Sequence, residues 1–377
     1  MRSVSHNRVW NHKDPFTGSS IFFGRLEKAG FESDGVFVCS ATWKDITEAR
    51  KIRPRFLVAR FDGVQHEQLS GRNIYGFVKQ RRPALLPAAK AAIWVPDLPA
   101  SLSEIFNRYL NKRAIWLLRN ADVLVFQSQL SRNMCREYLS HRPGDRPETV
   151  IFNAVDLDEF RPRKTGKLDG SPAVIIACAI HRLSKRLPQA IRLINCLADD
   201  FPRIHLHVLG AFDPLVEAAV STLDTSRCTF HGRIHHENLA TFYSGADVQL
   251  SLGVLDPCPN VVCEGLASGL PVLTPAESGA AELIGPANGH WAIQEGIKLE
   301  TYQSAYVAAL TPSLPVDPYI QAFQLIMDDL SEARRRARAR AEAALDIRSA
   351  AAKYTDFVAG ALSNQDVPKP HTNPASS

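Results

Sequence analysis

Residues 256–275 read DPCPNVVCEGLASGLPVLTP, and this stretch predicts a loop, a short helix and a buried strand in close succession. Proline lacks an amide hydrogen and clashes with the preceding turn, so residues 256–259 cannot lie inside a helix. Asn260 is a suitable N-cap, which predicts a helix over residues 261–268. Gly269 suits the left-handed residue that ends a helix, and the run PVLTP after it is typical of a buried strand. This order fits an α/β fold.

Two carboxylates flank the start of the predicted helix. Asp256 would lie in the loop at its mouth, and Glu264 would lie one turn inside it. Between them, the unpaired amides of Val261, Val262 and Cys263 would lie at the positive end of the helix dipole, where a phosphate binds readily. Two acids that accept hydroxyl hydrogens beside a phosphate cradle would suit a sugar nucleotide. A capped helix with two solvated acids is the alternative, and this stretch alone leaves both open.

A basic turn lies upstream, in the segment HRLSKR of residues 181–186. Arg182, Lys185 and Arg186 stand between a predicted strand and a predicted helix, where cations oppose the helix dipole and favour a bound anion. A diphosphate would satisfy Arg182 and Lys185 together with the amides after Asn260. The alternative for this motif is a solvated basic turn.

The segment HGRIHHENL holds three histidines, two of which have the i,i+4 spacing of metal ligands on a helix. Gly232 makes a helix across His231 and His235 unfavourable, so the two imidazoles need not share a face. We therefore expect no metal site here, but a strand, a loop and a helix that begins near His235 and His236.

Composition sets the broad class of the protein. A chain of 377 residues with 45% apolar content can bury a large core, and its length predicts two domains. It has no apolar run of about 18 residues that would span a membrane, and its first residues lack the apolar core of a signal peptide. A net charge of +5 fits anionic ligands or a membrane surface but is no nucleic-acid signature.

The cysteines contain no C-x-x-C pair, which predicts reduced core thiols in a cytoplasmic protein. They are Cys39, Cys135, Cys178, Cys196, Cys228, Cys258 and Cys263.

Strand and helix signals alternate along both halves of the chain. The predicted strands lie near residues 8–12, 35–41, 53–63, 122–128, 148–156, 173–180, 204–210, 228–234 and 247–253. The polar segment EFRPRKTGKLDGSP, residues 159–172, is typical of an interdomain linker. This alternation predicts two parallel, doubly wound sheets whose ligands lie at the carboxyl ends of the strands. A dinucleotide-binding oxidoreductase is disfavoured, because no G-x-G-x-x-G follows a strand.

Five segments in order resemble the donor half of glycosyltransferase family 4 over about residues 120–300. They are VIFNAVDLDEFRP, HRLSKR, TFHGRIHHENLATFYSGADVQLSLG, DPCPNVVCEGLASGLPVLTP and SGAAELIG. The resemblance implies the α/β GT-B fold, with two Rossmann-like domains facing each other across a cleft, and transfer with retention. It implies an acceptor-side domain over residues 1–160, joined by a C-terminal return helix at about 331–362. It further implies a donor-binding domain over 161–330. Separately, the last fifteen residues, 363–377, are too polar and proline-rich to pack, which predicts a disordered tail.

The same resemblance assigns roles to residues. Glu264 would hold the ribose hydroxyls and Asp256 would touch the transferred sugar, where the family usually has Glu. Arg182 and Lys185 would bind the diphosphate. Residues 153–156 match the family's hinge, with Ala in place of Gly. The implied donor-binding set is Glu264, Asn260, Val261, Val262, Arg182, Lys185, Gly232, Arg233, Gly18 and Ser19.

The first half matches the family less fully. Gly18 and Ser19 lie in a segment, DPFTGSS, that resembles the glycine loop approaching the donor phosphates. The acceptor-side histidine of many members is not evident. Asp97 is the candidate acid in that region, so the expected catalytic set is Asp256, Arg182, Lys185 and Asp97. His66 lies near a segment, RFDG, found in some bacterial members.

We therefore expect a cytoplasmic glycosyltransferase that uses a nucleoside diphosphate sugar, without a cofactor or a metal, in bacterial polysaccharide or glycoconjugate synthesis. Its acceptor would be a glycan or a lipid-linked glycan at the inner membrane leaflet, and no nucleic acid is expected as a partner. The arginines of residues 334–340 could meet anionic lipid or form a solvated helix face. A non-catalytic relative that binds a nucleotide or sugar as a regulatory or scaffold subunit is the alternative.

Overall fold

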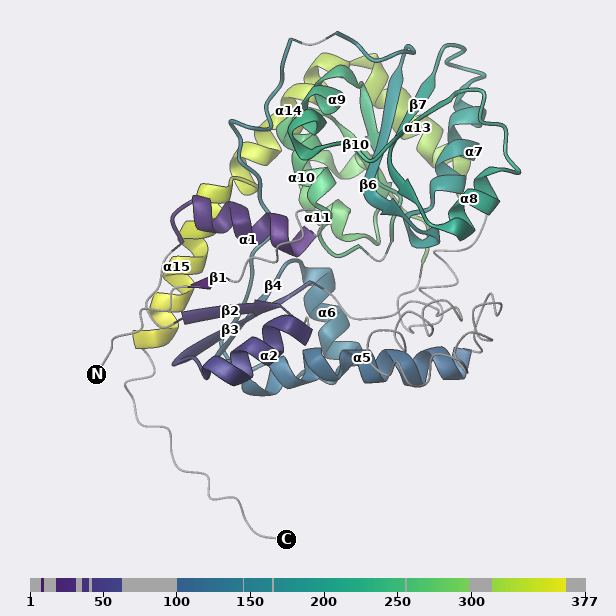
Figure 1. Cartoon of the computed structure of the whole chain (residues 1–377). Helices are drawn as coiled ribbons and strands as arrows, with labels where there is room; N and C mark the ends of the chain where they lie inside the picture. Colours follow the sequence, from purple (N-terminus) through teal and green to yellow (C-terminus); the bar gives the residue numbers. More distant parts are fainter. Residues whose placement is uncertain are drawn as a thin grey trace.

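The computed structural model describes residues 8–9, 18–31, 36–40, 43–62, 100–144, 146–164, 166–254, 256–297 and 314–363. These residues form two α/β units built on parallel sheets, which Figure 1 shows as a purple-to-blue unit and a teal-to-green unit. The first sheet has the strand order β1-β2-β3-β4-β5, and the second has the order β11-β10-β9-β6-β7-β8. The predicted parallel α/β architecture is therefore confirmed.

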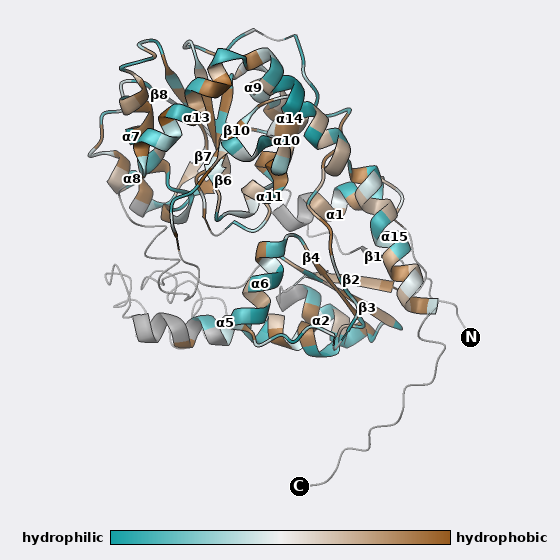
Figure 2. Ribbon diagram, turned by 180° about the vertical axis from the view of Figure 1, so that it is seen from behind, coloured by the Kyte–Doolittle hydropathy of each residue, from teal (hydrophilic) through white to brown (hydrophobic). Residues whose placement is uncertain are grey.

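The first unit contains five strands and four helices among the described residues. They are β1 (Arg8–Val9), α1 (Gly18–Lys28), β2 (Val36–Ser40), α2 (Trp43–Ile52), β3 (Phe56–Phe61), α5 (Ala100–Asn120), β4 (Val123–Phe126), α6 (Gln129–Tyr138) and β5 (Glu148–Val150). Alternate residues of each central strand face opposite layers: Val36 and Val38 of β2 pack with α1, and Phe37 and Cys39 pack with α2 and α5. Burial on both faces explains the uninterrupted apolar runs of these strands, which are brown in Figure 2.

The second unit follows residue 160. Its elements are β6 (Ala173–His181), η2 (Leu183–Lys185), α7 (Leu187–Leu197), β7 (His205–Phe212), α8 (Pro214–Val220), β8 (Cys228–Gly232), α9 (His236–Gly245), β9 (Val248–Leu250), α10 (Asn260–Ala267), β10 (Val272–Pro275), α11 (Gly279–Ile284), η3 (Pro286–Trp291), β11 (Ala292–Ile293) and α13 (Val316–Asp328). Chain order reverses between β6 and β9, which lie side by side in the sheet. This reversal is the switch point at which doubly wound sheets bind ligands.

The last two helices among the described residues are α14 (Leu330–Ala344) and α15 (Ile347–Ser363). The sequence predicted one helix here, but the chain bends at Leu345. There the amide of Val155 donates to the carbonyl of Leu345 at 2.9 Å, and the amide of Ile347 donates to Val155 at 3.0 Å. Helix α14 packs on α10, whereas α15 packs on α1 of the first unit (Figure 1). The hinge segment and the returning chain therefore cross between the units side by side.

The arginines of α14 make contacts inside the protein that neither the lipid-binding nor the solvated-face expectation predicted. Arg338 donates to the carbonyls of Ala267 at 2.7 Å and Phe160 at 2.9 Å, and Arg340 donates to Leu283 at 2.7 Å. Ala267 is the last residue of α10, whose carbonyls have no further partner in the helix. These side chains hold the carboxyl ends of two helices of the second unit, α10 and α11.

The cysteine expectation is right in one respect and wrong in another. All seven thiols are free, and four of them are buried: Cys39, Cys135, Cys258 and Cys263. Cys196 is exposed on α7, so it is not a core thiol. Its position at the carboxyl end of an amphipathic helix, near the polar edge, explains the difference.

Candidate functional site

Three of the predicted site residues, Arg182, Lys185 and Asp256, lie at the switch point of the second sheet. Strand β6 ends at His181 and leads into Arg182 and η2, and strand β9 leads toward Asp256. Because β6 and β9 pair in parallel, their carboxyl ends open at the same edge. Two motifs about 70 residues apart in the chain are brought together there.

Lys185 and Asp256 form an ion pair between the ammonium nitrogen and Oδ2 of the carboxylate. Their side chains keep 32% and 23% of their surface exposed, so the pair remains open to a ligand. Burial works against the charged ammonium, but the adjacent Asp256 carboxylate outweighs it and raises the pKa of Lys185. A cation and a carboxylate in contact at the sheet edge can meet both the phosphate and the sugar of one donor.

The start of α10 differs from the prediction by one residue. Pro259 is the N-cap and Asn260 is the first helical residue, so Asn260 does not cap the helix. The amides of Val262 and Cys263 both donate to the carbonyl of Pro259, at 3.0 and 3.4 Å. The expectation that these two amides are unpaired is therefore wrong. The first turn tightens onto the proline carbonyl because Pro259 holds an extended backbone that presents its oxygen to the helix.

Two glycines allow the chain to fold back on this loop. Gly269 ends α10 with a φ of +74°, as the sequence predicted. Gly279 donates its amide to the carbonyl of Asp256 at 3.2 Å, and a Cβ added there would lie 1.8 Å from the oxygen of Pro257. Only glycine therefore lets the loop after β10 approach the loop that carries Asp256.

Glu264 lies deeper and is engaged from both units. Its Oε1 accepts from Arg25 Nη2 of α1 at 2.7 Å, its Oε2 accepts from the hydroxyl of Tyr243 at 3.2 Å, and only 2% of its side chain is exposed. Burial alone would raise the pKa of Glu264, but the hydrogen bond to His236 and the charge of Arg25 outweigh it and hold that pKa below its usual value. Arg25 and Tyr243 therefore cover this carboxylate.

His236 opens α9 and lies between two acids. Its Nδ1 lies 3.2 Å from Glu159, and its Nε2 lies 3.7 Å from Glu264. Hydrogen bonding to Glu159 first and to Glu264 second raises the pKa of His236 to about 9. Its Nε2 also lies 3.0 Å from Nη2 of Arg25, a group that can only donate a hydrogen bond. The predicted strand, loop and helix are confirmed, with His235 as the N-cap. His231 belongs to β8 and contacts His207 at 3.0 Å instead, so His231 and His235 do not form one site.

The remaining predicted residues divide into two groups. Arg182 caps η2, and Gly232, with a φ of +66°, and Arg233 are exposed where β8 ends, so all three lie at the carboxyl edge of the sheet. Gly18 and Ser19 begin α1, the helix that carries Arg25. Asp97 and His66 lie outside the described residues.

Sequence reasoning missed the contacts that cross between the units. Asn153, in the predicted hinge, donates from its side chain to the carbonyl of Cys258 at 2.7 Å and so holds the loop that carries Asp256. Glu282 accepts the amides of Gln129 and Leu130, both at 2.7 Å, at the start of α6. A polar residue on a predicted helix carries no signal of its partner in another unit, so only the hinge motif pointed to any of these contacts.

Two features concern the part of the chain that the structure describes. No group of three or more His, Cys, Asp or Glu side chains in this part could hold a metal ion. None of its helices combines the length and apolarity needed to cross a membrane.

A family model for group 1 glycosyl transferases matches residues 159–310. No curated protein matches the chain in a sequence search. Among solved structures, the sucrose-phosphate synthase of Thermosynechococcus elongatus aligns over 92% of this chain and 78% of its own, with a TM-score of 0.57 and 17% identity. The HepE protein of Anabaena, solved with UDP-glucose, covers 90% of this chain and 82% of its own, with a TM-score of 0.54 and 15% identity.

The pneumococcal O-GlcNAc transferase GtfA, solved with UDP and GlcNAc, aligns with a TM-score of 0.56 and 11% identity. It covers 90% of this chain, which spans 60% of GtfA. At these identities the neighbours establish the fold, and the family match over the second unit supplies the activity. Together they identify this chain as a glycosyltransferase with the GT-B fold.

Proposed function

We propose that this chain is a retaining glycosyltransferase of the family 4 type, which moves a sugar from a nucleoside diphosphate sugar to a glycan acceptor. The observation that carries the proposal is the Lys185–Asp256 pair at the switch point, beside Arg182. Basic side chains beside a carboxylate at this edge suit a ligand that carries both phosphate and sugar hydroxyls.

The chemistry follows from where charge develops during transfer. As the bond between the sugar and the diphosphate breaks, the leaving group gains negative charge. Arg182 and Lys185, held at the sheet edge before the donor arrives, would stabilise that charge without reorganisation. Asp256 would break its ion pair with Lys185 and accept hydrogen bonds from the hydroxyls of the transferred sugar. We propose that the reaction needs neither a metal nor a cofactor, because these cations would neutralise the leaving group.

Glu264 would accept the ribose hydroxyls once Arg25 gives way. The residues alone do not identify the base of the donor nucleotide. HepE was solved with UDP-glucose, and GtfA was solved with UDP and GlcNAc. UDP-sugars are therefore the first donors to test. We further propose that the acceptor is a glycan or a lipid-linked glycan at the inner leaflet of a bacterial membrane, bound by the first unit, with Asp97 as its candidate acid.

A thermal-shift screen with UDP, GDP, ADP and their sugars tests the donor, since a ligand that binds only the folded state raises the melting temperature by mass action. With a donor in hand, Arg182→Ala and Lys185→Ala should lower turnover and diphosphate affinity while leaving affinity for the bare nucleoside nearly unchanged. Equal rates and equal diphosphate affinity in both variants would show that the basic turn is only surface. A stabilising nucleotide without transfer or hydrolysis of any sugar donor would favour the non-catalytic alternative.

A further inference from the structure

Arg186 is an unusual residue directly after Lys185. Its backbone takes a left-handed φ of +59°, a conformation that residues other than glycine adopt only at a cost in free energy. Its guanidinium is also buried, with 1% of the side chain exposed. A buried cation in strained backbone persists only where its surroundings hold it, so the contacts of Arg186 identify what holds it.

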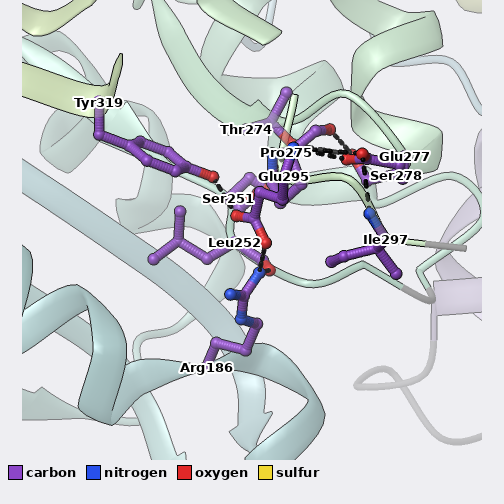
Figure 3. A network of polar contacts seen from close by, with 10 residues as sticks. All are labelled: Arg186, Ser251, Leu252, Thr274, Pro275, Glu277, Ser278, Glu295, Ile297 and Tyr319. Carbon is purple, nitrogen blue, oxygen red and sulfur yellow. Dashed lines mark hydrogen bonds and ion pairs between the residues drawn. The ribbon is translucent and has the colours of Figure 1, made fainter. Parts of the chain in front are cut away.

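Those contacts lead to a buried carboxylate, shown in Figure 3. Nη1 of Arg186 donates to Oε2 of Glu295 at 2.7 Å and to the carbonyl of Leu252 at 3.4 Å. The hydroxyl of Tyr319 donates to the other oxygen of Glu295 at 2.7 Å. Glu295 is 3% exposed, so both of its oxygens are used inside the protein. Nε of Arg186 is buried without a partner among the described residues, but both oxygens of Glu295 are paired. Contacts on both oxygens fix the orientation of Glu295 and, through it, of Arg186.

The network joins the loops after β6, β9, β10 and β11, the last of which carries Glu295. Leu252 follows β9 and precedes the loop of Asp256, while Arg186 lies in the turn after β6. The carboxylate of Glu277, after β10, accepts the amides of Glu295 and Ile297, both at 3.2 Å (Figure 3).

The amide of Gly279, two residues after Glu277, donates a hydrogen bond to the carbonyl of Asp256 at 3.2 Å. The turn that carries Lys185 and the loop that carries Asp256 are thus anchored to the same buried ion pair.

We propose that Arg186 is a positioning residue: through Glu295 it holds the turn after β6 so that Lys185 faces Asp256 and meets the donor diphosphate. Arg186 itself does not contact the donor. This inference rests on the proposed function, because it assumes that Lys185 binds the diphosphate.

The test is a double-mutant cycle. Arg186→Met combined with Glu295→Gln removes both buried charges at similar volume, a replacement that buried ion pairs often tolerate. This pair of substitutions is made in the natural chain and in the Lys185→Ala background. Calorimetry with UDP, GDP and ADP gives the affinity of the tightest nucleotide, and donor turnover gives the rate.

We expect at least a tenfold loss of diphosphate affinity and of turnover in the natural background. In the Lys185→Ala background we expect less than a twofold further loss, because the positioned group is already gone. Tyr319→Phe, which removes one bond to Glu295, should give a smaller loss of the same kind. An equal loss in both backgrounds would overturn the inference.

A control separates positioning from loss of stability. Arg334 donates to the carbonyl of Ala246 and to Asp247 in the same unit, with no contact in this network. Arg334→Met should lower the melting temperature without changing nucleotide affinity. If Lys185→Ala itself leaves affinity and rate intact, the assignment of Lys185 and the proposed site fall with the inference. If Lys185→Ala is defective but the losses are additive, only the role of Arg186 is wrong.

Discussion

At the scale of the residue, Asp256 and Glu264 have opposite surroundings although both belong to one short motif. Asp256 is partly exposed and pairs with Lys185, whereas Glu264 is buried and contacts Arg25. The prolines keep Asp256 outside the helix, and the helix carries Glu264 inward. This separation supports two different tasks for the two acids.

Asp256 should therefore matter for transfer more than for nucleotide affinity. Asp256→Asn keeps the shape but loses the charge, and we expect nearly unchanged affinity for the nucleoside diphosphate. Transfer should fall about 100-fold or more if the carboxylate stabilises the transition state. Asp256→Glu should be tolerated better, because it keeps the charge. The measurements are donor transfer, donor hydrolysis and calorimetric affinity on both variants. A loss of affinity in Asp256→Asn that equals the loss of rate would contradict this division.

His236 predicts a dependence of stability on pH. Its pKa is raised to about 9 in the folded protein, from an ordinary value of 6.5. The contribution of protonated His236 to the free energy of unfolding is therefore fully present below about pH 6.5 and is lost as pH rises through about 9. Because the side chain is partly exposed, we expect the loss to be about 1–2 kcal/mol. Urea unfolding at pH 6.5 and 9.5 measures it, and His236→Asn should lack this part of the slope. An unchanged slope in that variant would remove His236 as the cause.

At the scale of the element, local signals predicted most of the second unit. The prolines near Asp256 and the glycine at 269 constrain the backbone directly, so the bounds of α10 and β10 were correct within a residue. The start of α10 was wrong because an asparagine in the sequence can lie at the cap or just after it. The break at Leu345 was missed because the apolar pattern continues through it, and the bend depends on the contact with Val155.

Helix α14 gives a stability prediction with a matched control. Arg338 donates to three backbone carbonyls, including that of the last residue of α10. Arg335 is 76% exposed and pairs with Glu332 on the same helix. Arg338→Ala should lower the free energy of unfolding by about 1.5–3 kcal/mol, because a charged donor is lost from partly buried carbonyls. Arg335→Ala should change it by less than about 0.5 kcal/mol. Chemical denaturation of both variants checks this, and equal effects would show that the capping contacts carry no stability.

At the scale of the whole molecule, the two units meet through polar contacts that no local pattern encodes. Arg25 and Glu264 are 239 positions apart, and the amides of α6 that bind Glu282 are more than 150 positions away. The family resemblance predicted that two units would face each other. It did not predict that an arginine of the first unit would lie on the acid assigned to ribose, because that contact depends on how the units dock.

This contact predicts that the resting protein competes with its own donor. If Glu264 accepts ribose hydroxyls, Arg25→Ala should free the carboxylate and tighten nucleoside diphosphate binding by about 1 kcal/mol, the net value of a hydrogen bond. Glu264→Gln should instead weaken binding by about 1–3 kcal/mol, the value of a bond to a charged group. In the double variant, the gain from Arg25→Ala should disappear, because the acid that Arg25 covers is no longer charged.

Calorimetry on the natural chain and the three variants gives this cycle, with the melting temperature as a check that each is folded. Arg25 also donates to the carbonyl of Ala154 in the hinge, at 3.3 Å, so its loss should loosen the docking of the units as well. Looser docking by itself lowers affinity for a ligand held by both units, whereas release of Glu264 raises it. Tighter binding in Arg25→Ala would therefore identify competition at Glu264 as the larger effect. Weaker binding, unchanged by Glu264→Gln, would mean that Arg25 supports the donor site and that Glu264 does not hold the ribose.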